Sequence, residues 1–403
     1  MKIMKRGFCL LLAFAIFMIS SVYSSADTDD TTLDPPSNAT GETQVDADLQ
    51  PNLDLSCGAA VLMEASSGAV LFEQNKDTEL PPASVTKIMT LLLVMEAIDA
   101  GTMKLTDTVT ISAYAASMGG SQVFLEEGEQ MSVEDLVKCT VIASANDAAV
   151  ALAEHLLGSE SAFVDRMNAR ASELGLTACH FENVTGLDDD TQNHVLSAND
   201  IAVISRELIR HPLILTYSGV WIDTIRNGEF TLTNTNRLIR FYQGATGLKT
   251  GSTDKAKFCI TATAKRGDMT LIAVIMAAPS RDARNTDAKK LFDWGFATYG
   301  LYRDPAESCD PIKVCGGVAD VARGSHAEFT QVLPKSKLSK VEKQISLQPQ
   351  MTAPVEKGAQ IGTVSYLLDD EVIGTVPVCA DTAVQRIGFL QYVGRMLKIY
   401  LLS

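Results

Sequence analysis

Between residues 56 and 300, strand-like segments stand at both ends and helical segments lie between them. Short runs rich in β-branched residues predict strands at 59–63, 69–72, 247–252, 258–265 and 270–277. Apolar residues at helical spacing predict helices at 84–101, 133–143, 147–157, 160–174, 198–210 and 287–299. Strands on either side of a block of helices indicate an α+β fold and not a doubly wound parallel sheet.

The character of the chain changes after residue 303. Pro and Gly separate short alternating apolar runs over residues 304–381, which predicts a small all-β domain, most simply a β-sandwich. Residues 382–403 are predicted as an amphipathic helix, because Val384, Leu390 and Leu397 fall on one face. Cations interrupt this face and make spanning a bilayer costly, so we expect the helix to lie in the membrane interface. A helix packed on its own domain or on a partner is the alternative.

The N-terminus predicts export. Lys2, Lys5 and Arg6 precede an apolar run, and small residues follow at 24–26, which is typical of a secretory signal peptide over residues 1–26. An uncleaved anchor is the alternative. Residues 27–54 carry many acidic residues and no basic one, which predicts a disordered linker. We therefore expect the protein at the outer face of the cytoplasmic membrane or outside the cell.

Composition excludes some classes of function. The formal net charge of -15 argues against a nucleic-acid partner. The five histidines show no metal-ligand spacing, so neither a metal site nor a zinc peptidase is predicted. Seven cysteines follow the apolar N-terminal run, and only Cys309 and Cys315 lie close together, so a bridge between them stays open.

Ser84 and Lys87 form the first of three short motifs. Their spacing puts both side chains on one helix face. A buried lysine near another cation can lose its proton near neutral pH and activate a serine nucleophile. A helix-capping serine with a solvated lysine is the alternative reading.

Two further motifs follow along the chain. Ser144 and Asn146 stand between two predicted helices, where they can relay a proton and orient an amide, or simply cap a helix. Lys249, Thr250 and Gly251 lie in a predicted strand, where the first two can hold a carboxylate and the glycine permits close approach of a ligand backbone. A turn with a surface lysine is the alternative for this motif.

The order and spacing of these motifs resemble the penicillin-interacting serine enzymes. Pro-Pro-Ala-Ser84-Val-Thr-Lys87, Ser144-Ala-Asn-Asp-Ala-Ala and Thr246-Gly-Leu-Lys249-Thr-Gly-Ser look like the D-alanyl-D-alanine carboxypeptidases among low-molecular-mass penicillin-binding proteins. Asn183-Val-Thr-Gly-Leu-Asp188 and Arg284 match as well. The resemblance implies a β-lactamase/transpeptidase-like catalytic domain over 55–303, with an antiparallel sheet beside a helical cluster.

The resemblance also implies a mechanism without a cofactor. Ser84 would attack the substrate carbonyl, Lys87 would be its base, and Ser144 would pass a proton to the leaving D-alanine. The substrate-binding residues would be Asn146, Lys249, Thr250, Gly251, Ser252 and Arg284. The expected partners are a peptidoglycan stem ending in D-Ala-D-Ala, β-lactam inhibitors and, through the last helix, a membrane surface.

Two rival readings share these motifs. A class A β-lactamase would need an acidic residue some 30–40 positions after the second motif, and Glu173 and Glu182 fall in or near that window. A non-catalytic wall-binding scaffold on the same fold is the other, since a fold alone does not guarantee activity.

Overall fold

A computed structural model of the chain describes residues 51–402. The predicted signal peptide and all but the last four residues of the predicted linker therefore lie outside the described residues. No helix in the described part is long and apolar enough to span a bilayer.

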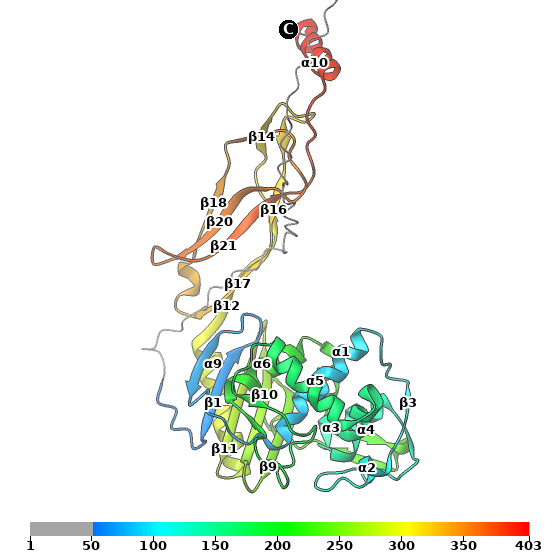
Figure 1. Ribbon diagram of the computed structural model, residues 1–403. Helices are drawn as coiled ribbons and strands as arrows, with labels where there is room; N and C mark the ends of the chain where they lie inside the picture. The colour runs from blue at the N-terminus through cyan, green and yellow to red at the C-terminus, as the bar shows by residue number, and fades with distance from the viewer. Residues whose placement is uncertain (1–50, 403) are drawn as a thin grey trace, which may run out of the picture. The chain divides into compact units, whose positions relative to one another are not determined.

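A five-stranded antiparallel sheet organises the first part of the described chain (Figure 1). Its strands, in spatial order, are β2 (Val70–Gln74), β1 (Ala59–Glu64), β11 (Met269–Ala278), β10 (Lys257–Arg266) and β9 (Ala245–Thr253). β1 pairs with β11 so that Val61 lies opposite Val274, which joins the two ends of this region in one sheet. The predicted antiparallel sheet is confirmed, and each of its five strands was predicted within three residues.

Alternate residues of the strands face two separate apolar clusters, as the two-residue period of a strand requires. Val61 and Met63 pack in the cluster that contains most of the helices, whereas Ala60 and Leu62 pack against the other face. The helices of the first cluster are α1 (Lys87–Asp99), α2 (Ala113–Ala116), α3 (Val133–Ile142), α4 (Asn146–Leu157), α5 (Glu160–Glu173), α6 (Ala198–Ile209) and α7 (Pro212–Ser218). Those of the second are α8 (Leu238–Phe241) and α9 (Arg281–Thr298). The predicted α+β class is confirmed.

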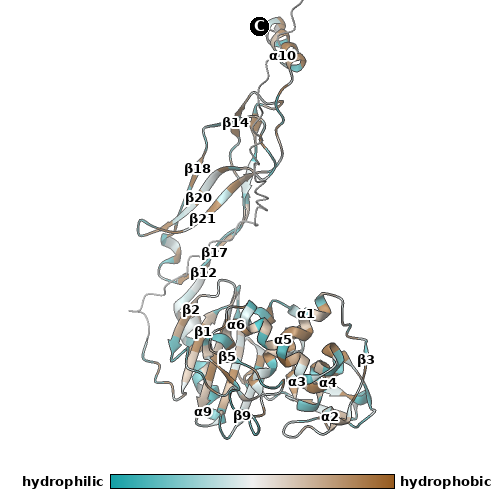
Figure 2. Cartoon of the chain, viewed as in Figure 1, coloured by the Kyte–Doolittle hydropathy of each residue, from teal (hydrophilic) through white to brown (hydrophobic). Residues whose placement is uncertain are grey.

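α1 is apolar on nearly every side, and Figure 2 colours it mostly as hydrophobic. It is correspondingly buried, as its sequence predicts. The predicted helix start at Ser84 is wrong by one turn. Ser84 lies in a 3₁₀ helix, η2 (Ala83–Thr86), whose Val85 N–H bonds to the carbonyl of Pro82 at 3.2 Å.

Short paired strands and turns complete this region. They are β3 (Thr108–Thr110) with β4 (Gln130–Ser132), β5 (Cys179–His180) with β6 (Val195–Leu196), and β7 (Ile222–Ile225) with β8 (Phe230–Thr233), joined by η3 (Arg226–Gly228). α9 begins six residues before the predicted start, because the Ser280 side chain accepts the backbone N–H of Ala283 and caps the helix there.

After α9 the chain is nearly all β. β12 (Tyr299–Asp304) pairs with β17 (Phe329–Pro334). A five-stranded sheet has the order β13 (Glu307–Ser308), β16 (Gly324–His326), β21 (Glu371–Ala380), β20 (Gln360–Leu368), β18 (Glu342–Leu347). A three-stranded sheet has the order β15 (Val321–Ala322), β14 (Ile312–Cys315), β19 (Gln350–Thr352), and η4 (Leu338–Lys340) lies before β18. Both sheets contribute to one apolar cluster that includes Val314 and Tyr366, which confirms a C-terminal all-β region. Cys309 and Cys315 are both free thiols.

The C-terminal helix, α10, runs over Phe389–Leu402. The prediction of a helix from residue 382 is wrong for its first seven residues, because Val384 forms a β-bridge with Val355 and is buried in the β-region. Apolar residues of α10 are exposed at Phe389, Leu390, Met396, Leu397 and Leu401, with Leu390 at 84% and Leu397 at 55% of their full surface. Figure 2 shows apolar and polar residues mixed along this helix.

Candidate active site

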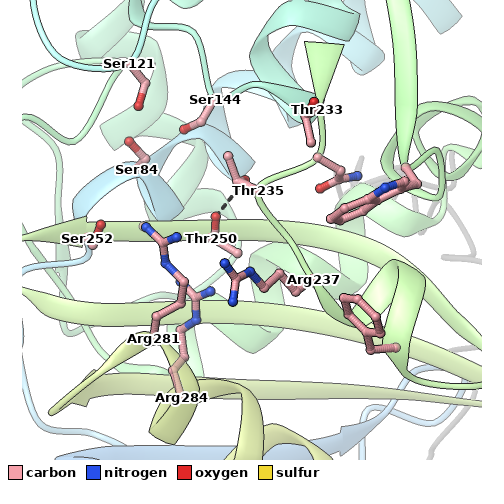
Figure 3. A pocket seen from close by; sticks show the side chains of 14 residues that line it. Ser84, Ser121, Ser144, Thr233, Thr235, Arg237, Thr250, Ser252, Arg281 and Arg284 are labelled. Carbon is pink, nitrogen blue, oxygen red and sulfur yellow. Dashed lines mark hydrogen bonds between the residues drawn. The ribbon is translucent and has the colours of Figure 1, made fainter.

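The three sequence motifs meet at the edge strand β9. The close approach of β9 to η2 depends on Gly251, since a Cβ there would lie 2.8 Å from the backbone nitrogen of Ser84 and 2.9 Å from that of Val85. The absence of a side chain at Gly251 therefore lets the backbone of η2 pack against β9, in addition to any ligand that approaches there. Beside it opens a cavity of about 640 Å³. Its lining includes six of the nine predicted site residues, namely Ser84, Ser144, Thr250, Gly251, Ser252 and Arg284 (Figure 3).

Lys87 lies beneath this cavity and is completely buried. Its Nζ is 2.9 Å from Ser84 Oγ, 2.6 Å from Asn146 Oδ1 and 2.7 Å from the carbonyl oxygen of Thr185. The amide and carbonyl oxygens can only accept hydrogen bonds, so two N–H groups of Lys87 must point at them. The remaining position on the nitrogen faces the Ser84 hydroxyl.

The surroundings of Lys87 favour its neutral form. Burial lowers the pKa of Lys87 well below its usual value, and the positive charge of Lys249 lowers it further. The Asp147 carboxylate opposes this shift but does not cancel it. A neutral Lys87 has a lone pair at the position that faces Ser84, and the geometry is that of a nucleophile beside its base.

Lys249 occupies the other side of the cavity floor. Its Nζ donates hydrogen bonds to Ser144 Oγ at 2.8 Å and to the carbonyl of Thr250 at 2.9 Å. Burial lowers the pKa of Lys249 to about 7, and the nearby charge of Arg284 contributes. The hydroxyl of Thr250 donates to Thr235 Oγ1 at 2.7 Å, as Figure 3 shows. This side can hold an anion through an ammonium group and a hydroxyl.

The turn between α3 and α4 places Ser144 and Asn146. Ser144 has a left-handed φ of 64°, which aims its side chain at Lys249, and α4 begins at Asn146. The Asn146 amide nitrogen donates to the carbonyl of Gly119 at 2.7 Å, which fixes the orientation in which its oxygen meets Lys87. The motif lies between two helices, as the sequence predicts, and its role as a proton relay stays a prediction.

Arg284 lies in the first turn of α9 and is only 3% exposed. Its guanidinium donates to the carbonyl of Cys259 at 3.3 Å and to Asn285 Oδ1 at 3.2 Å. Burial, followed by the like charge of Arg281, lowers the pKa of Arg284 to about 10. The group therefore remains a cation at neutral pH and faces the same cavity as Thr250.

The comparisons with known proteins agree with this geometry. A family model described as D-alanyl-D-alanine carboxypeptidase matches residues 43–280, and one described as penicillin-binding protein 5, C-terminal domain, matches residues 311–386. The chain belongs to the D-alanyl-D-alanine carboxypeptidase family. It is similar to the D-alanyl-D-alanine carboxypeptidase DacF of Bacillus subtilis, with 41% identity over 84% of this chain and 88% of that protein.

Solved structures show the same relationship. Penicillin-binding protein 5 of Haemophilus influenzae is 32% identical, with a TM-score of 0.73 over 82% of this chain and 98% of that one. Penicillin-binding protein D2 of Listeria monocytogenes, in its ampicillin-bound form, is 34% identical, with a TM-score of 0.57 over 61% of this chain and all (100%) of that one.

The family match and the positions of two glutamates also bear on the class A β-lactamase alternative. Glu173 pairs with Arg166 at 2.7 Å, and Glu182 accepts the backbone N–H groups of Gln192 and Asn193 at 2.8 and 3.0 Å. Neither glutamate lines the cavity, so neither stands where a β-lactamase needs its water-activating base. Within residues 51–402, no group of three or more potential metal ligands comes together.

Sequence reasoning missed the loop that supports the nucleophile. The Asn183 side-chain oxygen accepts the N–H groups of Thr185 and Gly186 at 3.1 and 2.7 Å, which shapes the turn that delivers the Thr185 carbonyl to Lys87. Gly186 has a φ of 81°, and a Cβ there would lie 1.9 Å from the carbonyl oxygen of Ala83. The match of residues 183–188 to the family's pattern was the available signal.

A buried histidine, His194, also stabilises this part of the site. His194 Nδ1 accepts the N–H of Glu182 at 3.1 Å, so its Nε2 carries the proton and donates to Thr86 Oγ1 at 2.8 Å. Burial lowers the pKa of His194 to about 4, which keeps the ring neutral. His194 does not line the cavity, so it affects the site through this turn and not by contact with a ligand.

Proposed function

We propose that this protein is a serine D-Ala-D-Ala carboxypeptidase, which removes the terminal D-alanine of peptidoglycan pentapeptide stems through an acyl-enzyme on Ser84. One observation carries the proposal. The nitrogen of a buried lysine, Lys87, has a single position free of carbonyl acceptors, and that position is 2.9 Å from the hydroxyl of Ser84. Family membership supplies the substrate class.

Acylation begins at Ser84. Neutral Lys87 takes the hydroxyl proton as Ser84 Oγ attacks the carbonyl of the penultimate D-alanine. The backbone N–H groups of Ser84 and Ser252 stabilise the negative charge that develops on the carbonyl oxygen. Their placement is supported by the contact of β9 with η2 across Gly251.

The leaving D-alanine is bound through its carboxylate. Lys249 and Thr250 hold this group, and Arg284 adds a second cation from α9. Ser144, bonded to Lys249, passes a proton to the departing amine, and Asn146 keeps Lys87 in position. Water then attacks the acyl-enzyme and releases the shortened stem.

β-Lactams inhibit this site because they present a reactive amide and a carboxylate at a matching separation. They acylate Ser84 and occupy the carboxylate site at Lys249 and Thr250. The solved ampicillin-bound relative supports this part of the proposal.

We also propose that the protein is exported and that α10 binds a membrane surface. The predicted signal peptide supports export. The exposed apolar residues of α10, together with Lys398 beside them, suit insertion into the headgroup region of a bilayer.

A fluorescent penicillin tests the catalytic proposal. The purified protein should be labelled covalently, and Ser84→Ala should not be labelled. Release of D-alanine from a pentapeptide should disappear in the same variant. If a folded wild-type protein takes up no label, the enzyme proposal fails and a scaffold role on the same fold becomes the better explanation.

A further inference from the structure

The cavity carries more positive charge than one D-alanine carboxylate requires. Three arginines line it, Arg237, Arg281 and Arg284, and its lining contains no acidic residue. Lys249 adds a fourth cation directly beneath Thr250. This concentration occurs in a protein whose formal net charge is -15, so it is local and does not follow from composition.

The surplus cations lie on the side of the leaving residue. Ser84 marks the scissile carbonyl, and Thr250 with Lys249 marks the leaving carboxylate in the proposed mechanism. Figure 3 shows the side chains of Arg237, Arg281 and Arg284 grouped near Thr250, apart from Ser121 and Ser144. Arg281 and Arg237 are also close enough to Arg284 for their charges to lower its pKa.

Arg237 and Arg281 are both exposed, and neither is held by a close ion pair in the described part of the chain. Arg237 lies 3.8 Å from Asp282, and the two side chains are 50% and 89% exposed. An exposed pair at that distance contributes little, so Arg237 is available to a stronger partner. Arg281 is exposed and lines the cavity.

We propose that these two arginines form a subsite for a second carboxylate on the residue that follows the scissile bond. The residue would be a D-amino acid with an acidic side chain, of the D-glutamate class. Lys249, Thr250 and Arg284 would bind its α-carboxylate, while Arg281 and Arg237 would bind the side-chain carboxylate. The inference rests on the proposed carboxypeptidase function and specifies its substrate.

The subsite works in both directions of the reaction. In cleavage, the C–N bond breaks and the D-residue leaves as an amine that has gained a proton. In the reverse step, the free amine of the same D-amino acid attacks the Ser84 ester and forms the C–N bond, the ester C–O bond breaks, and the proton lost by the amine passes to the oxygen of Ser84, which becomes a hydroxyl again. An acidic D-amino acid should therefore be both a preferred leaving residue and a preferred acceptor.

The decisive experiment compares two peptides that differ only in charge, one ending in D-Ala-D-Glu and the other in D-Ala-D-Gln. For the wild-type protein we expect kcat/KM to be about tenfold higher for the D-Glu peptide, as charge-assisted bonds to a carboxylate warrant. The double variant Arg237→Gln/Arg281→Gln should bring this ratio close to one. Arg210→Gln is the matched control, because Arg210 is an exposed arginine that pairs with Glu207 and does not line the cavity.

The outcomes separate this inference from the proposed function. A peptide ending in D-Ala-D-Ala is measured alongside. If that peptide is cleaved but the wild-type ratio is one or less, or if the double variant keeps the wild-type ratio, the subsite is wrong while the carboxypeptidase function stands. If no peptide is cleaved, both fail. Exchange of free D-glutamate into the product, followed by mass spectrometry, should show the same dependence on the two arginines.

Discussion

The Nζ of Lys87 lies 2.9 Å from the Oγ of Ser84, although the two residues belong to different helices, η2 and α1. The 3₁₀ turn brings the hydroxyl over the first residue of α1. This contact predicts the effect of removing the base. Lys87→Met keeps the volume and removes the nitrogen, so the rate of acylation by a fluorescent penicillin should fall by about 10²–10⁴.

Loss of labelling in Lys87→Met must be separated from loss of folding. The substitution removes the donor to the oxygens of Asn146 and Thr185, so the thermal unfolding midpoint should fall by only a few degrees while the cooperative transition is kept. Lys138→Met, which alters a lysine paired with Glu134 outside the cavity, should acylate at the wild-type rate. Unchanged acylation in Lys87→Met would exclude Lys87 as the base.

The pH profile should report Lys249. The pKa of this residue is about 7, so its charge is present below that pH and is lost above it. In the proposed mechanism the charged form binds the substrate carboxylate, so kcat/KM should decline as the pH rises above about 7. Arg284→Gln removes a neighbouring cation that lowers the pKa of Lys249, and the declining limb should therefore move to higher pH.

The position of the limb, not its height, is the readout for Arg284→Gln, since that variant also weakens binding. Arg303→Gln in β12 makes the same charge change at an exposed residue and should leave the limb where it is. A limb that stays in place in Arg284→Gln would mean that the two cations are not coupled.

Gly186→Ala should be among the most damaging single-methyl substitutions. The added Cβ would lie 1.9 Å from the carbonyl oxygen of Ala83, and the backbone there is left-handed. We expect a loss of about 3 kcal/mol or more in the free energy of unfolding, measured in urea. Gly175→Ala is the control. It has a similar φ of 71° but no neighbour within 4 Å, so it should lose only about 1 kcal/mol.

His194 should make the fold sensitive to acid. Its pKa is about 4 in the folded protein and near 6.5 in the unfolded chain, so the unfolded chain binds more protons between these values. Stability should therefore fall as the pH drops from about 6.5 towards 4, by up to about 3 kcal/mol. Urea unfolding at pH 7 and pH 4.5 measures this.

His194→Gln removes the titrating ring and should weaken that pH dependence, while it lowers stability at pH 7 by losing the bond to Glu182. His155→Gln is the control. His155 lies in the last turn of α4 and makes no comparable hydrogen bond within residues 51–402, so this variant should keep the wild-type slope. An undiminished slope in His194→Gln would place the acid-sensitive group elsewhere.

α10 should carry membrane binding. Leu390→Asp/Leu397→Asp puts two charges on its exposed apolar residues and should reduce co-sedimentation with anionic phospholipid vesicles at least tenfold. Val372→Asp changes an exposed apolar residue of β21 and should bind as the wild type does. D-Alanine release from a soluble peptide should be unchanged in all of these variants. Equal sedimentation of the double variant would reject the membrane role.

Much of the fold follows from periodicity. Strands β9, β10 and β11 and helices α3 to α6 were predicted within a few residues, because their buried faces impose clear two- and 3.6-residue patterns. The helix predicted from residue 382 was wrong at its start because apolar Val384 also suits a strand, and only the core of the β-region decides between them. Seven residues were misassigned for that reason.

The sequence named the side chains that meet in the candidate site, but not the backbone carbonyl that holds Lys87. The motif residues from Ser84 to Arg284 come together as expected. The Thr185 carbonyl could not be predicted, because every residue has one and only the turn around Asn183 aims it at Lys87. Arg237 and Arg281 were missed because single arginines carry no pattern until the fold brings them to one cavity.

Lys87, Lys249 and Arg284 are all buried, and their hydrogen bonds within residues 51–402 go to hydroxyl, amide and carbonyl oxygens and to no carboxylate. Burial and the neighbouring positive charges lower the pKa of each of the three, so every proton that this cluster holds has a cost in stability. A substrate carboxylate is the missing counter-ion of this cluster. Ligand recognition and charge neutralisation of the interior are thus one event, and binding of an anion should raise the stability of the fold as well as fill the site.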